Sequence, residues 1–370
     1  MKRILAYKRI YLIGLIPISY LLVMLAKSCS FFAEQIYAKH IYRWISQLIS
    51  FLTGLIPISL AEVLVFGLPI VAIILILRFT LNMIFDHENR RERFVKGILN
   101  LIGTLSVALF LFTLLAGLNY YRDSFSVYSN LELRESSIDD LYRLTKSLAL
   151  EANELRAQVP STDEEGVFQL SESYYALAKE ADQAFTKLAK EYPILGGYYG
   201  APKPVFLSKL MSSTEITGIF FPFTMEANVN VDIPDYNIPV TMLHELAHLR
   251  GFMREDEANY LAYLAGSEAD NIELQYSSTM LALVISGNAL YQQDKELYFQ
   301  IRDQYSEGVR KDLSANSAYW QKYEDTVVST VSNKLNDTYL KANAQADGVK
   351  SYGRMLDLLL AKYRKDHGLE

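Results

Sequence analysis

The segment HELAH, residues 244–248, combines the residue types of a zinc hydrolase site. On a helix, His244 and His248 lie on one face, about 40° apart around the axis, which suits two ligands of a tetrahedral zinc ion. Glu245 lies beside them, where its carboxylate can hold a water molecule and accept its proton. The spacing therefore predicts a catalytic zinc centre, and the alternative is a structural helix with two ordinary histidines.

The third protein ligand must come from outside HELAH. The other three histidines lie near the apolar segments or in the terminal tail: His40, His87 and His367. Gly251 can adopt the left-handed conformation that ends a helix, which would let the chain reverse. A second helix starting near Arg254 would then bring one of three acids back to the histidines: Glu255, Asp256 or Glu257.

The residues after HELAH carry a resemblance to known metallopeptidases. HELAHLRG fits the opening of the metzincin pattern HExxHxxGxxH, but Arg254 at the last ligand position excludes that class. The block EDEANYLA resembles the second helix of gluzincins, particularly of ImmA/IrrE-type metallopeptidases and HtpX-type membrane proteases. This resemblance implies Glu255 as the third zinc ligand and Asn259 as the partner of a ligand histidine. Only six residues separate HELAH from Glu255, fewer than in gluzincins, so Glu257 and then Asp256 stay alternative ligands.

Nearly the whole chain resembles a bacterial membrane family that is described only as a domain of unknown function with HExxH. The resemblance is carried by three apolar runs and by the segments GIFFPFTMEANVN, HELAHLRGFMREDEANYLAYL and GVKSYGRMLDLLLAKY. It implies a membrane topology and a metal, but it implies no substrate.

Two further segments are candidates for substrate binding and transition-state stabilisation. The strand-like run ITGIFFPF could bind an extended peptide by β-augmentation, or it could be a core strand that buries two apolar side chains. The residues expected to bind the peptide are Gly218, Ile219, Phe220 and Phe221. Tyr352 and Arg354, at the start of a late helix, are candidates to stabilise an oxyanion. The chain holds 26 tyrosines, so packing is the commoner role of any one of them.

Three uncharged, mostly apolar runs lie in the first third of the chain. Because a helix needs roughly 20 apolar residues to cross a bilayer, we expect transmembrane helices over residues 10–27, 60–85 and 98–121. A cleaved signal peptide is the alternative for the first run, but no A-x-A cleavage site follows it. Residues 33–55 are typical of an amphipathic stretch at the outer interface, with Trp44 at headgroup depth; a plain loop is the alternative.

Basic residues precede the first and third runs: Lys2, Arg3, Lys8, Arg9, Arg90, Arg91, Arg93 and Lys96. The positive-inside rule places these segments in the cytoplasm. Residues 1–122 are then a multi-pass anchor in the cell membrane with a cytoplasmic N-terminus. Residues 123–370 are expected to form an extracytoplasmic domain.

The two parts of the chain carry opposite net charges. Residues 1–122 hold 13 Lys+Arg and 5 Asp+Glu, a net charge of +8, and the remaining residues carry −14, which together give the −6 of the whole chain. An acidic domain offers no face that neutralises phosphates, so nucleic acid is not expected as a partner. The single cysteine, Cys29, allows neither a disulfide framework nor a cysteine-based metal site.

The residues after 122 predict an α+β domain in which helices dominate. Ser137 and Asp140 have the spacing of a capping box that begins a helix, and Pro160 would close it. A second helix is expected over residues 161–192.

The periodicity then changes from helix to strand. Short β-branched and aromatic runs over residues 204–211, 216–223 and 227–234 predict a small antiparallel sheet, with Pro222 marking an edge strand. Helices resume at Asn237 and Pro239, which are expected as the N-cap and first turn of the HELAH helix.

Taken together, the sequence predicts a membrane-anchored zinc metallopeptidase that hydrolyses peptides or membrane proteins at the bilayer. The alternative is a non-catalytic membrane protein whose HExxH helix is structural or binds zinc without turnover. An intramembrane protease is disfavoured, because HELAH lies more than 120 residues beyond the last apolar run.

Overall fold

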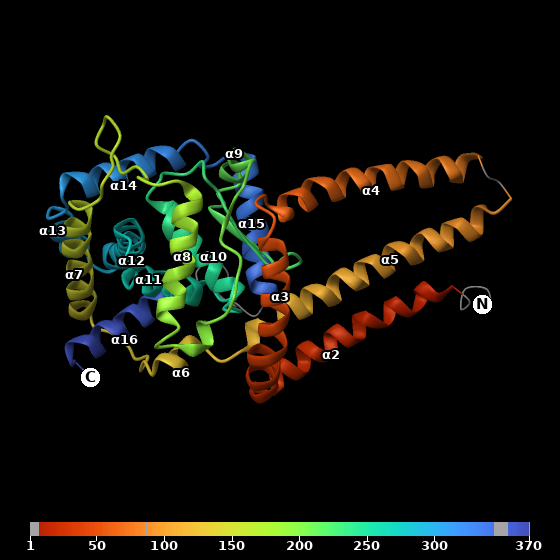
Figure 1. Cartoon of the computed structure of the whole chain (residues 1–370), viewed down its shortest axis with the longest axis horizontal. Helices are drawn as coiled ribbons and strands as arrows, with labels where there is room; N and C mark the ends of the chain where they lie inside the picture. The colour runs from red at the N-terminus through yellow and green to blue at the C-terminus, as the bar shows by residue number, and fades with distance from the viewer. Residues whose placement is uncertain (1–6, 86–87, 344–353, 370) are drawn as a thin grey trace.

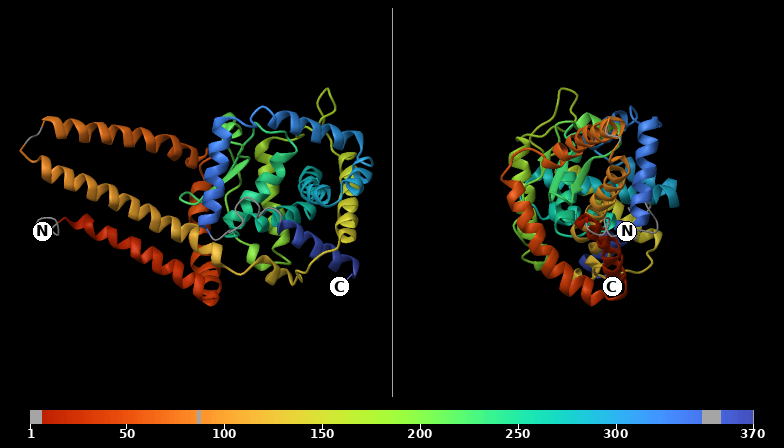
Figure 2. Two further views of the ribbon diagram at one scale, coloured as in Figure 1. Left: turned by 180° about the vertical axis from the view of Figure 1, so that it is seen from behind. Right: turned by 90° about the vertical axis from the view of Figure 1, so that its right-hand side faces the viewer.

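The computed structural model describes residues 7–85, 88–343 and 354–369 as a helix-dominated protein with a small three-stranded sheet (Figure 1). Three helical segments are long and apolar enough to cross a membrane: η1 (Lys8–Gly14) continuing into α2 (Leu15–Ser28), α4 (Leu60–Phe85) and α5 (Arg90–Leu115). All three project from one end of the remaining helical domain (Figures 1 and 2). The predicted fold class is confirmed.

The third apolar helix ends earlier than the sequence predicts. α5 stops at Leu115, and Ala116 breaks the helix with a φ of −148°. The 3-10 helix η3 (Gly117–Tyr121) follows, and its residues Leu118 and Asn119 are buried in the protein. The expected span over residues 98–121 is wrong at this end, because an uncharged apolar run does not distinguish a lipid-facing segment from a buried one.

The segment between the first two spans is helical rather than a plain loop. It forms the π-helix η2 (Phe32–Tyr42) and then α3 (Arg43–Gly54). α3 runs across the direction of the spans at the end of the domain from which they emerge (Figure 1). Its exposed face carries Trp44, Leu48 and Phe51, whereas Ser46 and Ser50 on the opposite face are buried. This amphipathic pattern agrees with the predicted interfacial helix, whose depth in the bilayer stays a prediction.

The same segment also contributes buried side chains to the domain. The Tyr42 hydroxyl lies 3.2 Å from the carbonyl oxygens of both His248 and Leu249 and donates to them. The buried Glu34 carboxylate lies 3.4 Å from the Arg122 guanidinium and accepts from the backbone N–H of Asp123 at 3.1 Å. Residues before position 122 are therefore part of the scaffold that supports HELAH.

The sheet is mixed rather than antiparallel. Its order is β1 (Lys203–Pro204), β3 (Glu226–Val229) and β2 (Gly218–Phe221); β1 pairs parallel to β3, and β2 pairs antiparallel to it. The strand expected over residues 204–211 is wrong, because the chain turns after β1 into the short helix α9 (Ser208–Ser213). β2 lies at the edge of the sheet, as expected, but it is shorter than the predicted run over residues 216–223 and ends just before Pro222.

Most of the other predicted helices are present. The capping box of Ser137 and Asp140 begins α7 (Ile138–Arg156). The helix expected over residues 161–192 is wrong in its first part: α8 covers only Tyr174–Leu188, and a turn at Gly166, with a φ of +79°, precedes it. The remaining helical elements are α6 (Phe125–Ser129), η4 (Pro193–Leu195), α12 (Ile272–Gln293), α13 (Lys295–Arg302), α14 (Glu307–Trp320), α15 (Val327–Ala342) and α16 (Met355–His367).

The HELAH helix lies at the centre of the domain. α10 (Asn237–Leu249) is buried along almost its whole length between the sheet and the helices α8, α11 (Glu255–Ser267) and α12. Asn237 is the first helical residue rather than the N-cap, and its side-chain amide donates to the Asn316 side chain at 2.8 Å. A contact with a distant helix replaces the expected cap. The site is thus carried by rigid, buried elements.

Candidate metal centre

A tight turn joins the two helices that carry the candidate ligands. Gly251 has a φ of +87°, and its N–H donates to the carbonyl of His248 at 2.9 Å. The N–H of Phe252 donates to the carbonyl of Ala247 at 3.2 Å, which completes the hydrogen bonding of a left-handed helix end. α11 begins at Glu255, so the predicted reversal at Gly251 is confirmed.

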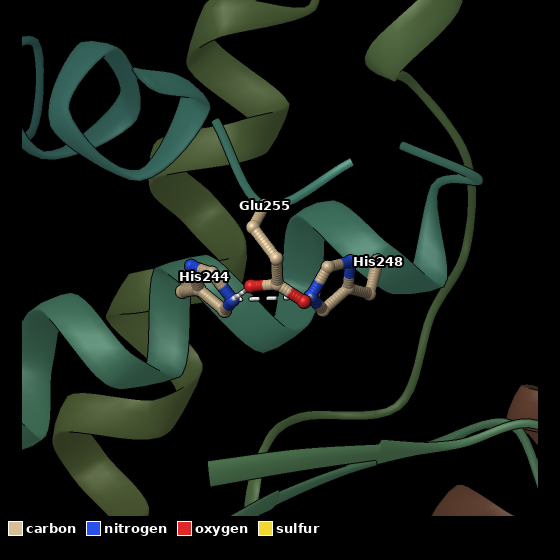
Figure 3. A group of neighbouring side chains, drawn as sticks. All are labelled: His244, His248 and Glu255. Carbon is tan, nitrogen blue, oxygen red and sulfur yellow. Dashed lines mark hydrogen bonds and ion pairs between the residues drawn. The ribbon is translucent and has the colours of Figure 1, made fainter. Parts of the chain in front are cut away.

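The structure brings His244, His248 and Glu255 together (Figure 3). The two Nε2 atoms are 3.0 Å apart, and the Glu255 carboxylate oxygens lie 3.2 Å from that of His244 and 3.7 Å from that of His248. Ligand atoms of a tetrahedral zinc ion with bonds of about 2.1 Å are about 3.4 Å apart. The separations of 3.0 Å between the two Nε2 atoms, 3.2 Å from His244 to Oε2 of Glu255 and 3.7 Å from His248 to Oε1 lie around this value, and the N, N, O chemistry suits that ion.

Both imidazoles are oriented by a hydrogen bond at their other nitrogen. Nδ1 of His244 lies 2.8 Å from Oδ1 of Asn259, and Nδ1 of His248 lies 2.8 Å from the carbonyl oxygen of Phe252. Such bonds fix the tautomer in which Nε2 carries the lone pair, which is the form that binds a metal. Asn259 is where the resemblance placed it. The Phe252 carbonyl was missed, since a backbone contact has no side-chain signal in the sequence.

The two alternative acids are engaged elsewhere. Glu257 accepts from the backbone N–H of Phe125 at 2.8 Å and forms an ion pair with Arg254 at 3.0 Å. Asp256 lies 3.3 Å from the Arg354 guanidinium. In the described residues, Glu255 is the acid that groups with the two histidines.

Burial and mutual charge shift the protonation of these groups in opposite directions. Burial disfavours the charged form of His244, but the contact with the Glu255 carboxylate outweighs it and raises the pKa of His244 to about 9. Burial lowers the pKa of His248 to about 4. Burial also raises the pKa of Glu245 to about 8, although the charge of His244 opposes this shift. Because a metal binds the neutral imidazole, metal binding at Nε2 of His244 is expected to release a proton near neutral pH.

Glu245 lies between the histidines and the edge strand. Its side chain is buried, and Oε2 has no hydrogen-bond partner within the part of the chain that the structure describes. A Cβ atom added to Gly218 of β2 would lie 2.5 Å from Oε1 of Glu245, so the strand backbone approaches the carboxylate as closely as only glycine allows. A buried carboxylate oxygen without a donor is costly unless a ligand or water completes it.

The predicted peptide-binding strand therefore lies against the candidate site. Ile219 is exposed, and the Phe220 ring lies 6.2 Å from the His248 ring between centroids. Phe221 is half-buried at the end of β2. The reading of a core strand that buries Ile219 is wrong, because an edge strand presents alternate side chains to solvent.

Of the two predicted oxyanion residues, Tyr352 and Arg354, the structure describes only Arg354. Tyr352 lies outside the described residues. Arg354 precedes α16, and its guanidinium lies 3.3 Å from the Asp256 carboxylate. Two unpredicted tyrosines lie within electrostatic range of the site. Burial, and to a smaller extent the charge of Glu245, raises the pKa of Tyr174, whose buried hydroxyl has no partner among the described residues. Burial, and to a smaller extent the charge of Glu255, raises the pKa of Tyr339 of α15. Among 26 tyrosines, nothing in the sequence singles them out.

Comparisons with known proteins give a family and no activity. No curated protein and no solved structure matches the chain. The likeness to ImmA/IrrE-type and HtpX-type peptidases thus rests on the local motif alone. The family model described as "Protein of unknown function (DUF3810)" matches residues 37–360, a range that includes α10, α11 and all three strands. The chain is a membrane protein that belongs to the DUF3810 family.

Proposed function

We propose that this protein is a membrane-anchored zinc metallopeptidase. The observation that carries the proposal is the spacing of three donor atoms for a tetrahedral ion, next to a buried carboxylate oxygen that lacks a partner. Zinc bound there would supply a Lewis acid that polarises a peptide carbonyl and acidifies a water molecule. His244, His248 and Glu255 are the proposed ligands.

Each neighbouring group has a role that its contacts support. Glu245 acts as the general base that takes a proton from the attacking water and passes it to the leaving amine. Asn259 and the Phe252 carbonyl hold the two imidazoles in the binding tautomer. β2 binds the substrate backbone in an extended form, so that the scissile bond lies opposite Gly218 and Glu245.

The test compares the full-length protein in detergent with its Glu245→Gln variant. We expect one zinc per chain in both, by elemental analysis, and hydrolysis of a peptide library by wild type only. General-base catalysis typically contributes 10²–10⁴-fold, so the variant should be at least about 100-fold slower. Glu268→Gln, at the exposed end of α11, is the matched control and should keep full activity.

Two outcomes would contradict the proposal. Folded wild-type protein that takes up no zinc would remove the metal centre. A Glu245→Gln variant with wild-type hydrolysis would leave no role for the carboxylate. Zinc binding with no cleavage by wild type of any peptide would favour a protein that binds zinc without turnover.

We also propose that the domain holding HELAH lies outside the cytoplasm. The support is the basic character of the short hairpin between α4 and α5 and of the N-terminal residues. In a Cys29→Ser background, a membrane-impermeant thiol reagent should label Glu268→Cys in intact cells and leave Arg91→Cys unlabelled. The reverse labelling pattern would place the domain in the cytoplasm.

A further inference from the structure

A cavity between two of the apolar helices reaches the edge strand of the candidate active site. α4 and α5 touch at the end far from the domain, where a Cβ atom on Gly97 would lie 2.5 Å from the Phe79 ring. The two helices diverge toward the domain (Figures 1 and 2). Between them lies a cavity of about 540 Å³. We call it the interhelical groove.

The groove is apolar along most of its length. α4 contributes Leu64 and Leu68, and α5 contributes Val107 and Leu111. η1 adds Leu12 and Arg9, and Nη1 of Arg9 donates to Oδ1 of Asn100 at 2.9 Å at the end far from the domain. Thr104, one turn along α5 from Asn100, is the other polar residue of the lining. Such a surface within the bilayer suits a hydrocarbon ligand.

The dimensions of the groove favour an acyl chain over a helix. Its lining on α5 runs from Asn100 to Leu111, which spans roughly 17 Å at ~1.5 Å per residue. Beyond the groove, α4 and α5 close on each other where the Phe79 ring meets Gly97. A transmembrane helix of ~10 Å diameter crosses the whole bilayer and would have to pass between the two helices at this point. A hydrocarbon chain that ends within the groove does not.

The groove is continuous with β2. Phe221, the last residue of β2, lines the groove together with Phe223. Gly218, the first residue of β2, lies against Glu245. The two ends of the strand are about 10 Å apart at ~3.3 Å per residue. A ligand that leaves the groove at Phe221 therefore needs about three extended residues to reach the candidate general base.

The pairing preference of the strand sets the direction of the peptide. Antiparallel pairing is slightly more stable per residue than parallel pairing. A peptide that adds antiparallel to the free edge of β2 runs from N- to C-terminus as it passes from Phe221 to Gly218. Its acylated residue must then lie on the N-terminal side of the scissile bond.

We infer that the interhelical groove holds the acyl chain of a substrate that is lipid-anchored near its N-terminus, and that cleavage falls about three to five residues after the acylated one. The inference rests on the proposed peptidase function. It assigns the groove to substrate recognition, so the spans select the substrate as well as anchor the enzyme.

The test uses one fluorescent peptide sequence in three forms: N-palmitoylated, C-terminally palmitoylated and unmodified. Binding is measured to full-length Glu245→Gln protein in nanodiscs, so that it does not depend on turnover. Leu68→Trp and Ala108→Trp fill the groove, and Ile70→Trp, on the opposite face of α4, is the matched control. We expect the N-palmitoylated form to bind at least about tenfold more weakly to both groove variants, with no change for Ile70→Trp.

Hydrolysis by the protein with Glu245 intact gives the second readout. We expect kcat/KM for the N-palmitoylated peptide to exceed that of the unmodified one at least about tenfold, with cleavage three to five residues from the acylated residue by mass spectrometry. Groove-dependent binding without hydrolysis of any form would support the acyl site and count against the peptidase.

Three results would overturn the inference without contradicting the proposed peptidase function. The first is equal kcat/KM for the acylated and unmodified peptides. Affinity for the N-palmitoylated peptide that is unchanged by Leu68→Trp, as by Ile70→Trp, would mean that the acyl chain only partitions into the bilayer. A preference for the C-terminally acylated form, or for a peptide fused to a transmembrane helix, would assign the groove another occupant.

Discussion

Two buried polar clusters lie near the turn between α10 and α11, and they differ in the groups that face their carboxylates. In the first, Glu34 faces Arg122, and Glu257 has both Arg254 and the Phe125 N–H as donors. In the second, Glu255 faces two imidazoles, and Oε2 of Glu245 has no donor in the described part of the chain. Arginine side chains match the carboxylates of the first cluster, which offsets the cost of burying them, whereas the second cluster is the one that we propose binds a cation.

Glu255→Gln is the substitution expected to have the largest effect, a loss of zinc affinity at the second cluster. Three protein ligands share a zinc-binding free energy on the order of 10 kcal/mol, so loss of one should weaken zinc affinity roughly 300-fold. Competition with a chelator measures this change. Zinc affinity that survives the substitution, but falls on changing Asp256 or Glu257, would move the third ligand.

Glu257→Gln should show the opposite pattern. It removes the charge that pairs with Arg254, whose side chain is partly exposed, so the loss of unfolding free energy should be at the lower end for buried pairs, about 3 kcal/mol. Thermal or urea unfolding of the metal-free protein measures it. The fraction that folds should still bind one zinc. A folded Glu257→Gln protein without zinc would erase the distinction between the clusters.

Asn259→Leu tests a group that acts on the metal only through His244. Loss of a hydrogen bond that orients a ligand imidazole typically costs 10–100-fold in metal affinity, and we expect a decrease in that range. Asn259→Asp keeps an acceptor and should restore most of it. If both variants bind zinc like wild type, the hydrogen bond has only a packing role.

The smallest expected effect is that of pH: zinc affinity should rise about tenfold for each pH unit up to about pH 9. The pKa of His244 is raised to about 9 in the metal-free protein, so its proton stabilises the fold fully below pH 6.5, and this stabilisation is lost as pH rises through 9. Zinc needs the neutral imidazole, so affinity should rise with pH up to about 9. Titration calorimetry in buffers of different ionisation enthalpy should detect protons released at pH 7. Zinc affinity that is flat from pH 6.5 to 9 would contradict a protonated His244.

The sequence predicts the metal centre better than its surroundings. HELAH and the reversal at Gly251 follow from local spacing, where helix geometry decides which side chains meet. Spacing alone leaves Glu255, Asp256 and Glu257 open as the third ligand, and the resemblance to gluzincins is what singles out Glu255 and Asn259. The misplaced end of the third span and the missing strand after β1 depend on what those segments pack against. Tyr42 and Tyr174 come from distant parts of the chain, and contacts of that kind leave no local pattern.

The contact between Tyr42 and the turn after HELAH has a consequence for how the sequence can vary. A Cβ atom on Gly251 would lie 2.9 Å from the Tyr42 ring, and the Tyr42 hydroxyl bonds the last carbonyls of α10. Because Gly251 also has a φ of +87°, a side chain at this position would be strained even if residue 42 were small. Among relatives, glycine is therefore expected at position 251, with a tyrosine at position 42 that ties the segment between the first two spans to the HELAH helix.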